Sequence, residues 1–203
     1  MKQLNMIKPG VIVLYLLLGC CLTATTGFAG DSKTLIMYYS RTGNTRAVCE
    51  ALAEKMDADL VEIRDLKNRM SRIGIVGGMF RTILGMRTDI LPEKIDMTQY
   101  DAVIIGAPIW AAKVPPAMRT AIYLNGFQGK KVVMLVTCDT FYAEKYQKKT
   151  QKLVEKSGGT VSAFYQIHAM EEQGEEEIAR GKDMMVADAL KLVPELERVL
   201  SLP

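Results

Sequence analysis

The chain has 203 residues, of which 49% are hydrophobic and 24% are charged. These values are ordinary for a single globular domain and exclude a largely disordered chain or a repeat array. Four cysteines and one histidine argue against a disulfide scaffold and a metal site, and a net charge of +3 without a basic, aromatic-bearing stripe argues against a nucleic-acid partner.

The first 30 residues differ in composition from the rest of the chain. Lys2 and Lys8 precede the apolar run Val11–Leu18, and the 20 positions from Val11 to Gly30 carry no charge. This order is typical of a targeting or anchoring segment. We therefore expect two parts, residues 1–30 as a signal peptide or membrane anchor and residues 31–203 as the folded domain, whose net charge is then only +1 because the first part holds two lysines and no acid.

Three interpretations of the N-terminal segment stay open. Small residues at Gly27 and Ala29 fit cleavage of a signal peptide after Ala29. The run Leu17–Cys20 resembles a bacterial lipobox, which would make the protein a lipoprotein acylated on Cys20. The third interpretation is an uncleaved helix, because 20 apolar residues just suffice to cross a bilayer. Each version predicts an exported or membrane-anchored protein on the periplasmic or outer side of the cytoplasmic membrane, since the two lysines tend to stay inside.

Beyond Gly30, β-branched runs alternate with helical patterns, which is typical of βαβ units around a parallel sheet. The predicted strands are Thr34–Tyr39, Asp59–Ile63, Ala102–Gly106, Lys131–Thr137 and Thr160–Ile167. The predicted helices are Thr45–Met56, Pro116–Leu124, Ala143–Lys156 and Lys182–Leu200, the last of which Pro194 should bend or divide. The expected fold class is α/β, a three-layer α/β/α sandwich with a five-stranded parallel sheet.

The loop after the first predicted strand, residues 40–45 with the sequence SRTGNT, runs directly into a helix. Ligands of open parallel sheets bind beyond the carboxyl ends of the strands. Hydroxyl groups, a glycine and the free amides of a helix N-terminus together predict a phosphate site. The dinucleotide fingerprint G-x-G-x-x-G is absent from this turn, which argues against binding of an NAD-type dinucleotide. The pattern G-x-x-x-x-G-K-[ST] is absent from the chain, which argues against nucleotide hydrolysis. The simpler alternative is that Ser40 and Thr42 only cap the helix.

Residues 35–45 resemble the first strand and phosphate loop of flavodoxins, whose pattern is [ST]-x-T-G-x-T, and every defined position matches. The resemblance continues through Tyr100–Trp110 to Pro115 and Pro116, and it covers roughly Lys33 to Leu200. It implies a flavodoxin-like domain that binds FMN. Many relatives carry glycines in the second flavin-contacting loop, where this chain has Cys138 and Asp139.

The resemblance implies roles for individual residues. The residues expected around the FMN phosphate are Ser40, Arg41, Thr42, Gly43, Asn44 and Thr45. Those expected beside the isoalloxazine are Ala107, Pro108, Ile109, Trp110 and Ala111, and, after the fourth strand, Cys138, Asp139 and Tyr142. The flat ring of Trp110 would cover one face of the flavin, with a buried core position as its alternative, and Tyr142 or Phe141 would cover the other.

Other reactive residues receive no catalytic role. A redox or phosphatase function of Cys138 is not favoured, because residues 139–143 lack an arginine and Asp139 would raise the pKa of the thiol. Cys49 is expected to pack inside a helix, and His168 to be structural. The acidic run from Glu171 to Glu177 is expected to form a solvated loop and the start of a helix.

The stretch from Leu66 to Tyr100 is long for a connection between a strand and a helix. Six cations and one acid lie between Arg64 and Arg87, interleaved with apolar residues and glycines. One interpretation is a glycine-hinged helix over the sheet edge. The other is a lid or docking surface for a quinone, a membrane or a partner protein.

The expected function is electron transfer by an FMN-binding flavoprotein whose partner is a redox protein or a quinone. The alternative is an FMN-dependent NAD(P)H or quinone oxidoreductase that uses Leu66–Tyr100 to bind a second, planar substrate. For that substrate Met79, Phe80, Leu84 and Met86 would supply apolar contacts. A domain that no longer binds flavin is a third class, and the complete phosphate-loop pattern argues against it.

Overall fold

The computed structural model describes residues 33–67, 72–139, 142–173 and 176–201. The chain separates into two units, residues 1–31 and 32–203, and only the second contains described residues. The expected signal or anchor segment, residues 1–30, and Phe141 therefore lie outside them. Within the described ranges, no helix combines the length and the apolar character needed to cross a membrane.

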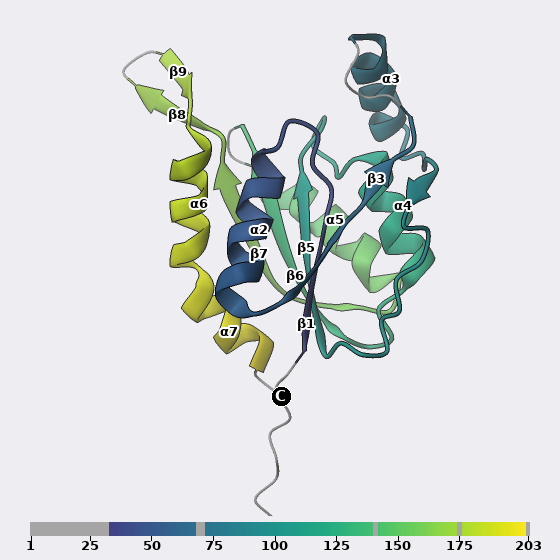
Figure 1. Cartoon of the computed structure of the whole chain (residues 1–203). Coiled ribbons are helices and arrows are strands. Elements are labelled where there is room, and N and C mark those ends of the chain that lie inside the picture. Colours follow the sequence, from purple (N-terminus) through teal and green to yellow (C-terminus); the bar gives the residue numbers. More distant parts are fainter. Residues whose placement is uncertain (1–32, 68–71, 140–141, 174–175, 202–203) are drawn as a thin grey trace, which may run out of the picture. The chain divides into compact units, whose positions relative to one another are not determined.

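Five parallel strands form the central sheet in the order β2-β1-β5-β6-β7 (Figure 1). They are β1 (Thr34–Tyr38), β2 (Asp59–Glu62), β5 (Ala102–Pro108), β6 (Lys131–Cys138) and β7 (Thr160–His168). All five predicted strands are confirmed. The strand order reverses at β1, which pairs with β2 on one side and with β5 on the other. The carboxyl ends of β1 and β5 are therefore where this topology opens a crevice for a ligand.

Helices cover both faces of the sheet, so the expected three-layer sandwich is confirmed (Figure 1). The helices on one face are α2 (Asn44–Met56), α6 (Lys182–Lys191) and α7 (Val193–Ser201). Those on the other are α4 (Pro116–Asn125) and α5 (Glu144–Glu155). Neighbouring residues of β1 point into opposite cores, Leu35 towards α4 and Ile36 towards α2, which explains why the strand is apolar without interruption. The last predicted helix is divided beside Pro194, as expected.

Two small antiparallel pairs were not predicted. Strands β3 (Arg64–Asp65) and β4 (Ile90–Leu91) pair with each other, and helix α3 (Arg72–Ile83) lies between them in the chain. Strands β8 (Met170–Gln173) and β9 (Glu176–Ala179) form a hairpin where we expected a solvated loop and a helix start. At the base of this hairpin, Arg180 donates its backbone N–H to Ala169 and its guanidinium binds Asp188 of α6 at 2.5 Å. These bonds hold the chain extended until α6 begins.

Gly106 is the point at which α2 approaches β5 most closely. A β-carbon there would lie 2.3 Å from Cys49 Sγ and 2.9 Å from Tyr38 Cβ. Cys49 and Tyr38 are both buried, so neither atom can move into open space. The missing side chain therefore sets how deeply the first turns of α2 sit against the sheet.

We predict that Gly106→Ala lowers the free energy of unfolding by about 2–3 kcal/mol, because the added methyl group overpacks this contact. In a Cys49→Ala background the same change should cost less, since the closer of the two clashing atoms is gone. Gly77→Ala is a matched control, because nothing lies within 4 Å of the β-carbon position there. Urea denaturation of the four variants measures these differences, and an equal penalty in both backgrounds would refute the assigned contact.

Candidate functional site

The loop between β1 and α2 exposes a row of backbone amides. Gly43 has φ of 95°, in the left-handed region, and its N–H donates to Ser40 Oγ at 3.2 Å. The first hydrogen bond of the helix runs from Ala47 N–H to Gly43 O at 3.0 Å. The amides of Asn44, Thr45 and Arg46 therefore have no acceptor one turn back and lie at the positive end of the helix dipole. This is the arrangement that binds phosphate.

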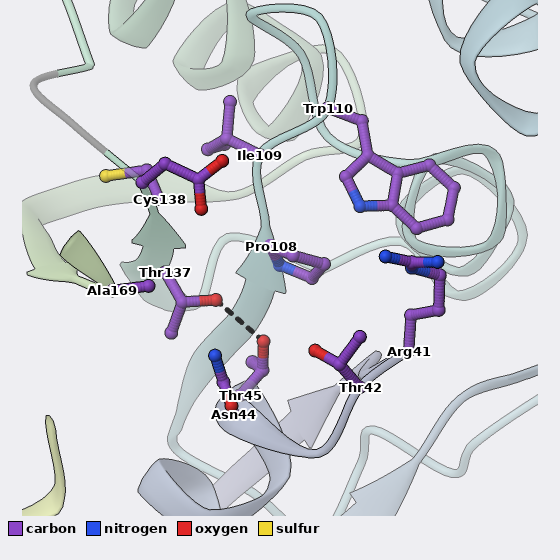
Figure 2. A pocket seen from close by; sticks show the side chains of 11 residues that line it. Arg41, Thr42, Asn44, Thr45, Pro108, Ile109, Trp110, Thr137, Cys138 and Ala169 are labelled. Carbon is purple, nitrogen blue, oxygen red and sulfur yellow. Dashed lines mark hydrogen bonds between the residues drawn. The ribbon is translucent and has the colours of Figure 1, made fainter. Parts of the chain in front are cut away.

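A buried hydrogen bond joins this loop to the far side of the crevice. Thr45 Oγ1 and Thr137 Oγ1 lie 2.7 Å apart, and the dashed line in Figure 2 marks the contact. Thr45 lies in the first turn of α2 and Thr137 is the penultimate residue of β6, so the bond holds the start of the helix against the end of β6. A hydroxyl group donates one hydrogen bond and accepts two. Thr45 can therefore receive a hydrogen bond from Thr137 and still donate its own proton to a ligand.

A cavity of about 160 Å³ lies between the loops that follow β1, β5 and β6 (Figure 2). Hydroxyl groups and the α2 amides gather at one end, and Trp110 stands at the other. The residues that line it are Arg41, Thr42, Asn44, Thr45, Pro108, Ile109, Trp110, Thr137, Cys138, Asp139 and Ala169.

Trp110 lies in the cavity wall and not in the core. Its ring meets Tyr39 edge to face at 5.7 Å, and the Arg41 guanidinium lies 6.0 Å from the indole centre. Trp110 and Lys113 exchange backbone hydrogen bonds of 2.9 and 3.0 Å across a tight turn. The two central residues, Ala111 and Ala112, have φ of 46° and 58°. Alanine rarely adopts this conformation, so the turn that presents the tryptophan is strained.

Two further cavities adjoin the first and share Ile109 and Asp139 with it. One, of about 210 Å³, lies between the Trp110 turn and helix α3, from which Met79 enters its wall. The other, of about 230 Å³, lies on the side of Tyr142 and Tyr146. A planar ring beside the ends of β5 and β6 therefore has space on either side of Ile109.

The expected site residues come together, with four adjustments. Ala107 is buried in the core and lines none of these cavities. Ser40 and Gly43 shape the turn but line none of these cavities. Ala111 lines the cavity beside α3 instead of the one beside the amides. Tyr142 is only 3% exposed, and its hydroxyl lies 2.9 Å from that of Thr150. Its ring stacks on Tyr146 at 6.2 Å, so the half-buried Tyr146 presents the more accessible aromatic surface.

Several lining residues were not identified from the sequence. Thr137 ends a predicted strand, and its position at the carboxyl edge was the available signal. Tyr146 and Ala169 carry no motif. Met79, by contrast, was expected to contact a second planar substrate, and it lines the cavity beside α3. Lys182 was also missed, although its ammonium nitrogen lies 2.9 Å from the position that a β-carbon on Gly43 would occupy. The first turn of α6 therefore brings a cation to the outer side of the phosphate loop.

Burial disfavours the thiolate form of both thiols near the site. Burial, with a smaller effect from Asp139, raises the pKa of the Cys138 thiol to about 11, so it stays protonated at neutral pH. Burial also raises the pKa of Cys49, which packs against Gly106. Among the residues that the structure describes, no group of three His, Cys, Asp or Glu side chains is placed to hold a metal ion.

Solved structures of flavoproteins share this fold. The chain is similar to a flavoprotein from Lactobacillus acidophilus NCFM, solved in complex with FMN, with 21% identity and a TM-score of 0.57 over 66% of this chain and 93% of that one. A putative flavoprotein from Bacteroides uniformis ATCC 8492 is 21% identical to the chain, with a TM-score of 0.57 over 77% of this chain and 96% of that one. A putative flavoprotein from Bacteroides eggerthii DSM 20697 is 23% identical, with a TM-score of 0.53 over 80% of this chain and 98% of that one.

No curated protein sequence matches the chain. The sequence model of the flavodoxin family matches residues 33–161. That match covers more than half of the chain and includes the phosphate loop, the strand that ends at Pro108 and the loop that carries Trp110. The chain therefore belongs to the flavodoxin family.

Proposed function

We propose that this protein binds FMN and serves as an electron carrier. One observation carries the proposal: a single cavity has the free amides of α2 and the hydroxyls of Thr42 and Thr45 at one end and the indole of Trp110 at the other. The first end suits a terminal phosphate, and the second suits a flat aromatic ring. The FMN complex of the Lactobacillus relative supports this assignment.

The phosphate end favours FMN over riboflavin and FAD. Riboflavin has no phosphate to offer the amides of Asn44 and Thr45. FAD would have to extend its adenosine part past the loop, where the Ser40–Gly43 turn closes on itself. Bound FMN would supply one-electron and two-electron chemistry at its ring, and the protein would supply binding, orientation and exclusion of water. Lys182 would add a positive charge close to the phosphate.

A carrier needs only an exposed ring edge and no reactive side chain. The Cys138 thiol beside the ring position is held protonated, and no other described side chain has an assignable role in proton or hydride transfer. The redox partner would be a protein or a quinone. We further propose that the domain works on the outer side of the cytoplasmic membrane, because Lys2, Lys8 and the uncharged run from Val11 to Gly30 are typical of an exported or lipid-anchored chain.

One observation favours the alternative, an FMN-dependent NAD(P)H or quinone oxidoreductase. Met79 of α3 lines a separate cavity with Arg41, Ile109 and Trp110. A second planar substrate in that cavity would lie beside the ring, as an oxidoreductase requires.

Replacing Thr42 by alanine should weaken FMN binding by roughly 10- to 100-fold, because a hydrogen bond to a charged group is worth about 1.5–3 kcal/mol. Riboflavin affinity should stay unchanged, and Thr42→Ser should restore FMN binding because it keeps the hydroxyl. Calorimetric titration of residues 30–203 with both ligands measures this difference. Equal losses for FMN and riboflavin would contradict the phosphate assignment.

Adding FMN to the apoprotein should quench the emission of Trp110, which is the single tryptophan of the chain. Trp110→Ala should lower FMN affinity by about 3- to 10-fold through loss of an aromatic contact, and Trp110→Phe should lower it less. Fluorescence and absorption titrations report both effects. An emission that FMN leaves unchanged would show that the indole lies away from the ring.

Steady-state oxidation of NADH and NADPH with a soluble quinone distinguishes the carrier function from the oxidoreductase function. For a carrier we expect slow, unsaturable turnover that Met79→Ala leaves unchanged, and stepwise reduction in two resolved one-electron steps. Met184→Ala is the matched control, since Met79 and Met184 are 43% and 45% exposed and Met184 lies on α6. Rapid, saturable turnover that only Met79→Ala abolishes would establish the oxidoreductase.

A further inference from the structure

Helix α3 exposes its apolar side. Val76, Met79, Phe80 and Ile83 follow the spacing of one helical stripe, and their side chains are 68%, 43%, 61% and 53% exposed. A surface helix of a globular protein normally turns such a stripe towards the core. Leu84 and Met86, just beyond the helix end, are also exposed.

The opposite side of α3 holds the helix on the domain. Gly78 and Thr82 are buried one turn apart, and the Thr82 hydroxyl donates to Gly78 O at 2.8 Å. Lys113, in the Trp110 turn, donates its ammonium group to Ile83 O at 2.6 Å and so binds the carboxyl end of the helix. Small residues therefore pack inwards, and this packing fixes the apolar stripe on the outside.

The segment that contains the stripe is strongly cationic. Six cations and one acid lie between Arg64 and Arg87. Lys67 and Arg87 are exposed, and the Arg87 guanidinium stacks 3.7 Å from the ring centre of Tyr123, itself an exposed aromatic residue. An exposed apolar stripe in a segment rich in arginine and lysine is typical of a helix that lies in the interface of an anionic bilayer.

We propose that α3 binds the surface of an anionic membrane. The stripe, defined as Val76, Met79, Phe80 and Ile83, enters the boundary between headgroups and acyl chains. The exposed cations Arg87 and Lys67 contact the lipid phosphates. Charge complementarity selects the bilayer as the occupant, and the uncharged run from Val11 to Gly30 would hold the domain within reach of it.

Membrane binding by α3 would bring the lipid to the edge of the site. Met79 belongs both to the stripe and to the wall of the cavity that contains Trp110. A lipid-soluble electron acceptor, a quinone by its chemistry, would then reach that cavity from the bilayer. This consequence rests on the proposed function, whereas binding of α3 to lipid does not require FMN.

The test uses residues 30–203, which contain the complete sheet and both helix layers but not the apolar N-terminal segment. FMN-loaded and apoprotein are each sedimented with vesicles of phosphatidylcholine alone and with vesicles that also contain phosphatidylglycerol. Both forms should bind the anionic vesicles, less tightly as salt increases, and bind the neutral ones weakly. Phe80→Ser with Ile83→Ser should lower the partition coefficient at least about tenfold, and Lys67→Gln with Arg87→Gln should remove the preference for anionic lipid.

Control variants keep surface chemistry comparable. Met184→Ser with Leu190→Ser removes two exposed apolar residues of α6, and Lys55→Gln with Lys156→Gln removes two exposed cations from other helix ends. Both should bind vesicles like the wild type. Far-UV circular dichroism and the melting temperature show whether each variant is folded.

Two results would overturn the proposal. One is wild-type protein that sediments with neither vesicle, and the other is a Phe80→Ser, Ile83→Ser variant that binds as well as the controls. Sedimentation velocity tests the competing occupant, which is a second copy of this chain. A wild-type dimer that dissociates in this variant would mean that a second copy binds the stripe. FMN affinity is measured in parallel, so protein that binds vesicles but not FMN would refute the proposed function and leave this inference intact.

Discussion

The site depends on how closely α2 approaches the sheet at Gly106. Cys49 Sγ lies only 2.3 Å from where a β-carbon on this residue would be, so any side chain would push the helix away. The same packing brings Thr45 within 2.7 Å of Thr137 and thereby joins the loop after β1 to the end of β6. Two residues beyond Gly106, the chain leaves β5 and forms the wall that carries Trp110. One packing constraint thus brings three loops together around one cavity. It also fixes the unpaired amides of α2 in position relative to the indole of Trp110.

Departures from ordinary folding rules gather along one edge of this cavity. Ala111 and Ala112 hold left-handed backbone angles in the turn beside Trp110. Next to that turn, α3 places its apolar stripe outside and its small residues inside, and Lys113 connects the two features through Ile83 O. Strained backbone and exposed apolar surface both cost stability, and they persist where a ligand or partner uses them. The proposed flavin edge and the proposed membrane-binding stripe therefore form one structural unit.

Much of this arrangement was predictable from the sequence. Strands buried on both faces must be apolar throughout, so all five were found, and the phosphate loop has a local signature of hydroxyls, a glycine and a helix start. Contacts made by side chains from distant segments were not predictable in the same way. Tyr146 and Ala169 reach the cavities only because α5 and the chain after β7 lie where they do. Tyr142 was expected beside the ring, but its side chain is buried and its hydroxyl lies 2.9 Å from that of Thr150. The hairpin β8-β9 was mistaken for a loop because its acidic residues indicate solvent exposure and not backbone pairing.

The central claim is that the free amides at the start of α2 bind the phosphate of FMN. The most direct measurement is a titration of ¹⁵N-labelled residues 30–203 with FMN, riboflavin and inorganic phosphate, followed through the backbone amide chemical shifts. The account predicts that FMN and inorganic phosphate both cause large shifts at Asn44, Thr45 and Arg46, that riboflavin leaves these three amides nearly unchanged, and that only the two flavins shift the residues around Trp110. Shifts of the same size at Asn44 and Thr45 with riboflavin as with FMN would contradict it.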